Sequence, residues 1–494
     1  MYSRLLLPSF FLFILLAVCA GQNITVVRPI DERLPLFENW EKPRLLLFFT
    51  GFLEGYVEPC GCAGIDNMKG GLGRRHTALQ QLERKGWEVL PIDAGNLNRG
   101  FGLQEELKFN FVIDEAFRLM RYRAVGLGNR ELLFPTDTLI LYSMDVPGIP
   151  KRYTSANVGL YDFTPDIMKP YRVLEKAEMK IGVVSVIGDS LLRNIQNDDI
   201  VTANSAEKLR EILPQLDTYH CDYKVLIIHG SNSEIDQLLT QFAARFDFVL
   251  PSNTAAEPPL QPRRIGNTMI IEVGEKGRYA VAVGLFDDPA VPMRYERIPM
   301  DARFDNSPMI LEAMKMYQEQ LRLSGLEGLG IRPIPNARLA TQGNYAGVQS
   351  CVDCHETALH VWRQSGHARA WHSLTNTAIP PRNYDPECIA CHVVGWNATE
   401  LLPYQGGFLS VRETPRLIDV GCEACHGPGE NHVRAEAGTN VTLQQRLREA
   451  MRLPVEGGAA RRHCITCHDG NNSPFFDFDT YWKKIEHPEE DIFQ

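Results

Sequence analysis

The C-terminal third of the chain repeats one pattern of cysteine and histidine. Four C-x-x-C-H motifs follow residue 350, namely Cys351-Cys354-His355, Cys388-Cys391-His392, Cys422-Cys425-His426 and Cys464-Cys467-His468. In such a motif the two thiols can add to the two vinyl groups of one porphyrin, and the next imidazole then reaches the iron. The sequence therefore predicts four covalently bound haem c groups, with these cysteines as thioether attachment points and these histidines as proximal iron ligands.

Zinc is the alternative occupant of paired C-x-x-C motifs, and a single C-x-x-C can also be a redox dithiol. A histidine directly after the second cysteine in all four motifs favours haem. The chain has only 13 histidines among 494 residues, so four such coincidences do not arise by chance.

Each haem iron needs a sixth ligand or keeps an open face. Six further histidines lie in this region: His360, His367, His372, His432, His463 and His487. They are enough for complete bis-histidine ligation, and His372 is a candidate distal ligand on this ground alone. Any one of them can instead be an ordinary surface or core histidine.

The segments "SCVDCH", "SGHARAW", "CIACHVVGW" and "VGCEACHGPGENH" resemble the tetrahaem cytochrome c family that includes the electron acceptor of hydroxylamine oxidoreductase. The resemblance covers roughly Tyr345 to His487. It implies a mainly α-helical multihaem domain, with His367 and His432 as distal ligands by matching position. His487 lies where related chains often carry another ligand. Some members of the family leave one haem five-coordinate, and the sequence leaves open whether this chain does.

The first half alternates strand-like and helical segments from Arg44 to about Pro299. This alternation predicts an α/β layered fold. The loops "FTGFLEGYVEPCGC", "DAGN" and "GNRE" follow predicted strands, where such folds carry their sites.

In their order, these loops resemble the calcineurin-like metallophosphoesterases, specifically the bacterial 5′-nucleotidase branch, over residues 43–300. The resemblance also identifies the positions of the metal ligands. Asn129 and His229 match the family, whereas its remaining aspartate and histidine positions are occupied by Phe52, Glu54, Asn96 and Arg130. Because a two-metal hydrolase needs clustered carboxylates and imidazoles, we expect no phosphoesterase metal pair and no phosphoesterase activity.

The first of these loops carries Cys60 and Cys62, as in a UshA-like branch of the same family that has a Cys-Gly-Cys loop. In an oxidising compartment the two thiols can close a strained, easily reduced disulfide, or they can bind a soft metal. A passive structural role and a partnership with Cys221 are the alternatives. We treat Cys60 and Cys62 as a tentative redox pair.

The N-terminus has the features of a signal peptide over residues 1–20. Arg4 precedes an apolar run from Leu5 to Val18, and Ala20 provides a small residue before the cleavage point. We expect a periplasmic or otherwise exported protein, with a lipid anchor at Cys19 as the less favoured alternative. No later segment is long and apolar enough to span a bilayer. The net charge of −10 argues against nucleic-acid binding.

These observations predict a signal peptide (1–20), a degenerate metallophosphoesterase-like α/β domain (43–300), a helix and linker (301–344) and a tetrahaem domain (345–494). The favoured function is electron transfer between redox partner proteins, with the first domain as a thiol redox or docking module. The alternatives are a haem-dependent oxidoreductase of a small nitrogen or sulfur compound, an active metallophosphoesterase, and a purely structural role for the first half.

Overall fold

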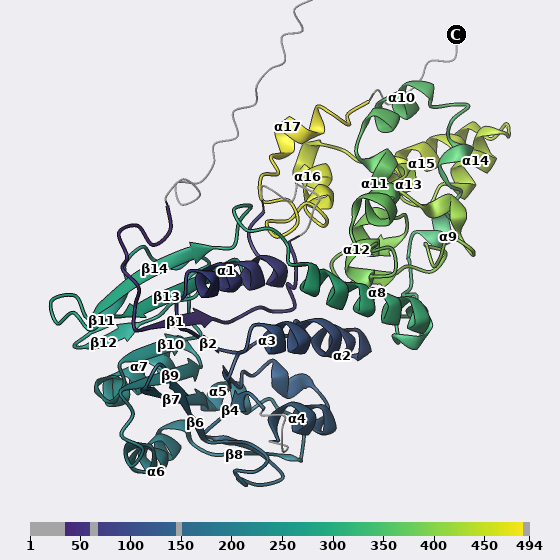
Figure 1. Cartoon of the computed structure of the whole chain (residues 1–494). Coiled ribbons are helices and arrows are strands. Elements are labelled where there is room, and N and C mark those ends of the chain that lie inside the picture. The colour runs from purple at the N-terminus through teal and green to yellow at the C-terminus, as the bar shows by residue number, and fades with distance from the viewer. Residues whose placement is uncertain (1–34, 60–67, 145–150, 488–494) are drawn as a thin grey trace, which may run out of the picture. The chain divides into compact units, whose positions relative to one another are not determined.

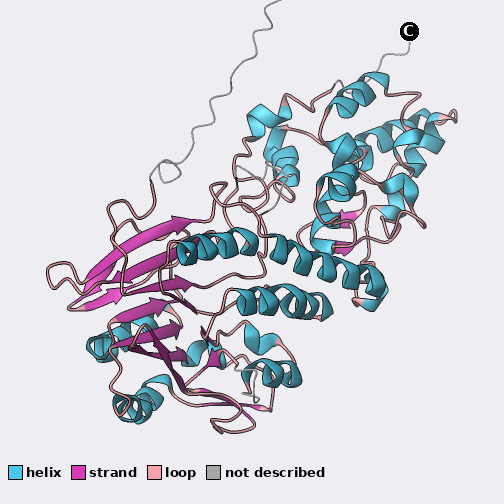
Figure 2. Cartoon of the chain, viewed as in Figure 1, coloured by secondary structure: helices cyan, strands magenta, loops and turns pink. Residues whose placement is uncertain are grey.

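The computed structural model describes residues 35–59, 68–144 and 151–487. Residues from Leu36 onward form one compact unit. Strands are concentrated in its N-terminal part (residues 36–299), whereas helices and loops make up most of its C-terminal part (residues 345–487) (Figure 2). Within the described residues, no helix is long and apolar enough to cross a membrane.

The first sheet of the N-terminal part has the strand order β14-β13-β1-β2-β3-β4. Strands β1 to β4 are parallel, and β13 and β14 continue the sheet in antiparallel fashion. In chain order the strands are β1 (Leu45–Thr50), β2 (Val89–Asp93), β3 (Ala124–Gly126), β4 (Tyr153–Thr154), β13 (Tyr279–Leu285) and β14 (Met293–Pro299).

The second sheet has the order β11-β12-β10-β9-β7-β6, with a parallel centre and antiparallel edge strands. Its strands are β6 (Tyr171–Lys176), β7 (Met179–Ile187), β9 (Tyr223–His229), β10 (Phe248–Pro251), β11 (Arg263–Ile265) and β12 (Thr268–Ile270). A separate pair is formed by β5 (Val158–Leu160) and β8 (Ile200–Thr202).

The two sheets pack face to face and share one apolar cluster. Because side chains alternate between the two faces of a strand, neighbouring residues of β1 lie on opposite faces of its sheet. In β1, Phe49 belongs to the cluster between the sheets, where its ring centroid lies 5.7 Å from that of Phe248 on β10. Its neighbour Phe48 points to the opposite face and packs with the helices there. Both phenylalanine side chains are completely buried.

Helices cover the outer face of each sheet, which gives the α/β layered fold that the alternation predicted (Figure 1). The first sheet is covered by α1 (Leu72–Arg84), the π-helical segment Phe109–Asp114, α3 (Glu115–Leu119) and α8 (Pro308–Gly328); α6 (Ser205–Asp217) and α7 (Asn232–Phe242) cover the second. The remaining helices here are α2 (Leu103–Lys108), α4 (Thr136–Ser143) and α5 (Asp189–Leu192), with 3₁₀ turns at Glu131–Leu133 and Ala243–Arg245.

The C-terminal part consists of short helices around a small apolar cluster that includes Tyr345, Ile389, Trp396 and Phe408. Its helices are α10 (Glu356–Gln364), α11 (Ala370–His372), α12 (Pro386–His392), α13 (Cys422–His426), α14 (Glu430–Glu436), α15 (Val441–Met451), α16 (Ala459–Cys464) and α17 (Phe478–Trp482), and α9 (Leu339–Gln342) precedes them in the chain. Two short strands, β15 (Trp396–Asn397) and β16 (Leu402–Pro403), pair with each other. Further helical turns are Val348–Ser350, His367–Arg369, Ser373–Thr377, Pro415–Leu417 and Glu456–Gly458.

Candidate haem-binding centre

Three of the four motif histidines each face a second histidine. The ring centroids are 6.3 Å apart for His355 and His432, 6.1 Å for His468 and His367, and 5.8 Å for His426 and His487. An imidazole nitrogen lies about 2.0–2.1 Å from a bound metal, so two rings on opposite sides of one metal have centroids roughly 6 Å apart. The three pairs therefore have the spacing that a shared iron requires.

The orientation of three motif histidines is fixed through their Nδ1 atoms. In His392, Nδ1 lies 2.7 Å from the carbonyl oxygen of Ala370. In His426 it lies 2.6 Å from the carbonyl oxygen of Met451, and in His468 it lies 2.9 Å from the hydroxyl of Ser473. A ring that donates from Nδ1 keeps the lone pair on Nε2, which is the atom that binds a metal.

Burial keeps these imidazoles neutral. It lowers the pKa of His367 to about 4, with the nearby His468 and His392 adding to the effect. Burial also lowers the pKa of His392, His426 and His468. Because only the neutral ring has a lone pair for a metal, the site is in its metal-binding form at neutral pH.

The cysteines of different motifs lie next to one another. The thiols of Cys351 and Cys422 form a hydrogen bond between the first and third motifs. Cys467 forms one with Cys391, between the fourth and second motifs. Cys425 of the third motif also interacts with the cysteines of the fourth. The first motif therefore lies beside the third, and the fourth beside the second.

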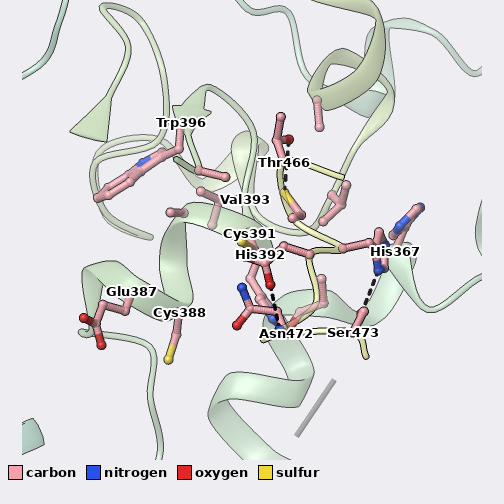
Figure 3. Close-up of a pocket in the computed structure, with 18 of the residues that line it drawn as sticks. His367, Glu387, Cys388, Cys391, His392, Val393, Trp396, Thr466, Asn472 and Ser473 are labelled. Atoms are coloured by element: carbon pink, nitrogen blue, oxygen red, sulfur yellow. Dashed lines mark hydrogen bonds between the residues drawn. The ribbon is translucent and has the colours of Figure 1, made fainter. Parts of the chain in front are cut away.

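A cavity of about 2130 Å³ is lined by residues of the second and fourth motifs, together with several residues of the third. It is at least twice the roughly 300–1,000 Å³ of a usual small-molecule pocket. Figure 3 shows Cys391, His392 and His367 gathered beside Asn472 and Ser473. The paired imidazoles, the neighbouring cysteines and this volume fit haem.

The remaining candidate, His372, is exposed at the end of α11. In the described part of the chain it makes no ring contact with a motif histidine, and its assignment as a distal ligand stays a prediction. His360, also exposed, hydrogen-bonds to Gln364 within α10.

The loops of the N-terminal part bring together the residues at the former metal-ligand positions. The ring of Phe52 packs edge-on against His229, with centroids 5.7 Å apart. Asn96 donates from Nδ2 to Oδ1 of Asn129 over 3.3 Å, and Arg130 pairs with Glu54 over 3.5 Å. Each of these side chains thus has a neighbouring side chain as its partner.

The backbone of these loops is unusual at three of the same positions. Phe52, Glu54 and Asn96 have φ angles of 51°, 52° and 56°, in the left-handed region that costs a non-glycine residue roughly 1–3 kcal/mol. Glu131 joins the loop after β2 to the loop after β3. Its carboxylate accepts hydrogen bonds from the backbone N–H groups of Asn96, Leu97 and Gly128. Burial raises the pKa of this carboxyl to about 7.

Over residues 35–59, 68–144 and 151–487, no group of three or more His, Cys, Asp or Glu side chains is arranged to hold a metal ion. Cys60 and Cys62 lie outside the described residues, as does Cys19. Pro59 and Met68, on either side of the cysteine loop, line the cavity described above.

Residues 350–427 match the family model of cytochrome c554 and c-prime. The C-terminal part is similar to cytochrome c-554 of Nitrosomonas europaea, with 32% identity over 146 residues, which is 26% of this chain and 60% of that protein. It thus resembles the cytochrome c554 family, as its motifs predicted, and this family implies covalently bound haem c.

The N-terminal part is similar to 5′-nucleotidases. The identity is 23% over 266 residues with the rat protein, covering 50% of this chain and 45% of that one. It is 24% over 230 residues with the human protein, covering 44% and 39%. The chain therefore spans less than two thirds of each curated relative. A 5′-nucleotidase precursor from Thermus thermophilus superposes with a TM-score of 0.45 at 16% identity, covering 65% of this chain and 68% of that one.

The nucleotidase-like part (residues 36–299) contacts the helix that carries the second haem motif. Lys108 Nζ lies 2.8 Å from Glu387 on α12, next to Cys388, and 2.7 Å from Glu105, and its side chain is only 1% exposed. Arg382 pairs with both carboxylate oxygens of Glu58, at 2.6 Å from Nη2 to Oε2. The sequence does not reveal this contact, because the single lysine in "ELKFNF" has the spacing of an ordinary helix surface residue.

The buried His229 makes the stability of the nucleotidase-like part depend on pH. Burial lowers its pKa from the ordinary value of 6.5 to about 4, so the unfolded chain binds more protons between these two values. The free energy of unfolding should therefore fall by about 3 kcal/mol as the pH drops through this window. Urea unfolding followed by circular dichroism measures it.

In this experiment the His229→Gln variant should lose that share of the pH dependence, whereas the exposed control His360→Gln should keep it. An identical pH slope in wild type and His229→Gln would show that His229 does not titrate in this way.

Proposed function

We propose that this protein is an exported multihaem cytochrome that transfers electrons through four covalently attached haem c groups. The observation that carries the proposal is the set of three imidazole pairs with ring centroids 5.8–6.3 Å apart. Bound haem supplies reversible one-electron chemistry. The chain holds each haem by two cysteines and one motif histidine, and a second histidine completes the ligand set.

The proposed distal ligands follow from the ring pairs. His432 serves the haem of His355, His367 serves that of His468, and His487 serves that of His426. His372 is retained from the sequence as a candidate for the second motif. The close approach of the first motif to the third, and of the fourth to the second, supports haems near enough to pass electrons in series between a donor and an acceptor protein.

The nucleotidase-like part is proposed to act as a docking module and not as a phosphoesterase. Its former ligand positions pair with one another, and its Lys108 and Glu58 hold the region around the second haem motif. Cys60 and Cys62 are proposed as a redox pair on the sequence alone. The second candidate function, a haem-dependent oxidoreductase of a small nitrogen or sulfur compound, is favoured by the cationic side chains in the cavity wall, which would attract an anionic substrate.

Removal of one distal histidine should open one iron. In the haem-loaded His432→Ala variant, electron paramagnetic resonance should show about one iron per chain moving from the low-spin to the high-spin signal, because a strong sixth ligand is lost. The control His360→Ala removes an exposed histidine of the same part and should leave the spectrum of the wild type unchanged. If His432→Ala also leaves it unchanged, His432 is not a ligand.

The purified protein should release no phosphate from nucleotides when Mg²⁺ or Mn²⁺ is added. Two divalent ions need several anionic ligands to hold them against a phosphate, and the loops place Phe52, Asn96 and Arg130 at those positions. A phosphate-release assay measures this. Metal-dependent turnover that a chelator abolishes would contradict the proposal.

The thiol proposal predicts a separable effect. The Cys60→Ser variant should keep the full haem content but exchange electrons with a redox partner at a different rate, because one half of the pair is removed. Stopped-flow spectroscopy of haem reduction measures the rate, with Cys221→Ser as the matched control. Equal rates in wild type and Cys60→Ser would remove the redox role.

A further inference from the structure

Two cationic side chains of the nucleotidase-like part donate hydrogen bonds to the same residue of the C-terminal part, which we call the cytochrome-like part (residues 345–487). Lys276 Nζ lies 2.6 Å from Oδ1 of Asn471, and Arg278 Nη2 lies 2.9 Å from the same oxygen. Both cations are half-buried and line the cavity that contains residues of the second and fourth haem motifs. Asn471 follows His468 by three residues, so the cations lie beside the fourth motif.

Neither cation has a carboxylate partner in the part of the chain that the structure describes. Three other cations of this wall differ from them, since Lys108 and Arg99 pair with Glu387 and Arg382 pairs with Glu58. One neutral amide oxygen does not compensate two positive charges, and their mutual repulsion is poorly screened in a half-buried site. An anion placed between them would remove this cost.

The backbone of this turn is held in place at Lys276 and Gly277. Lys276 has a φ of 57°, and its N–H donates to the carbonyl of Phe52 over 2.7 Å. Gly277 has a φ of 62° and sits so close to Leu53 that an added Cβ would lie 2.8 Å from its Cδ1. Lys276 Nζ also lies 5.0 Å from the ring centroid of Tyr56. Donors that are fixed in this way bind a ligand without first having to be ordered.

We propose that Lys276 and Arg278 form an anion-binding site in the wall of the haem cavity, which takes a carboxylate or a small inorganic oxoanion. The inference rests on the proposed attachment of haem. Two sources share this chemistry: a propionate of an attached haem, and a free oxoanion that enters the cavity. A lysine and an arginine suit both, because each donates charge-assisted hydrogen bonds to carboxylate or oxoanion oxygens.

The test uses the oxidised, haem-loaded protein and the variants Lys276→Gln, Arg278→Gln and Arg278→Lys. Arg44→Gln is the matched control, because Arg44 belongs to the same part, pairs with Asp287 and lies outside the cavity wall. Haem content per chain is measured first, so that a failure of haem attachment is recognised separately. Calorimetric titration with inorganic phosphate and the propionate-bending band in resonance Raman spectra are then compared.

One outcome supports the site with a free oxoanion as its ligand. The wild type then binds phosphate saturably, and the affinity falls at least about 10-fold in both glutamine variants but not in Arg278→Lys or Arg44→Gln. A second outcome supports the site with a haem propionate as its ligand. The wild type then binds no phosphate, and the propionate band shifts in both glutamine variants but not in Arg278→Lys or Arg44→Gln. If the glutamine variants match Arg44→Gln in both measurements while all contain haem, Lys276 and Arg278 bind no anion and the inference is wrong.

Discussion

Two imidazole rings can share one metal only when they stand about 6 Å apart with nitrogens facing each other, and the cytochrome-like part is arranged around this constraint. Its apolar cluster is small, so hydrophobic burial alone specifies little of its shape. The ring pairs, in contrast, join residues far apart in the chain. His367 meets His468, and His355 meets His432. A haem held by such a pair would therefore cross-link segments that are distant in the chain.

In the loops of the nucleotidase-like part, side chains pair with one another at the positions that the resemblance gives to metal ligands. The left-handed residues Phe52, Glu54 and Asn96 still form tight loops at the ends of β1 and β2. Dications need anionic ligands, but here an aromatic–imidazole contact, an amide pair and an ion pair fill those positions. Within the described residues, these positions therefore offer no cluster of carboxylates and imidazoles of the kind that a two-metal site needs.

Much of this arrangement was predictable from the sequence, and the exceptions have physical reasons. The buried run before Phe52 predicted β1, and the C-x-x-C-H spacing predicted the attachment points. His367 and His432 came from the resemblance alone, because nothing in their local spacing identifies a ligand. Which histidine faces which motif depends on tertiary packing, so the pairing became visible only in three dimensions. Lys108 was missed for a related reason: its role is set by Glu387, 279 residues further along the chain.

Ion pairs link the two halves at the second motif. Lys108 is buried between Glu105 and Glu387, and removal of one member of such a group leaves an uncompensated charge that typically costs about 3–5 kcal/mol. A phosphoesterase neutralises its anionic substrate with metal ions. In this chain, the turn with Lys276 and Arg278 carries positive charge and is hydrogen-bonded directly to Phe52. The turn therefore places positive charge both beside Phe52 and in the wall of the cavity.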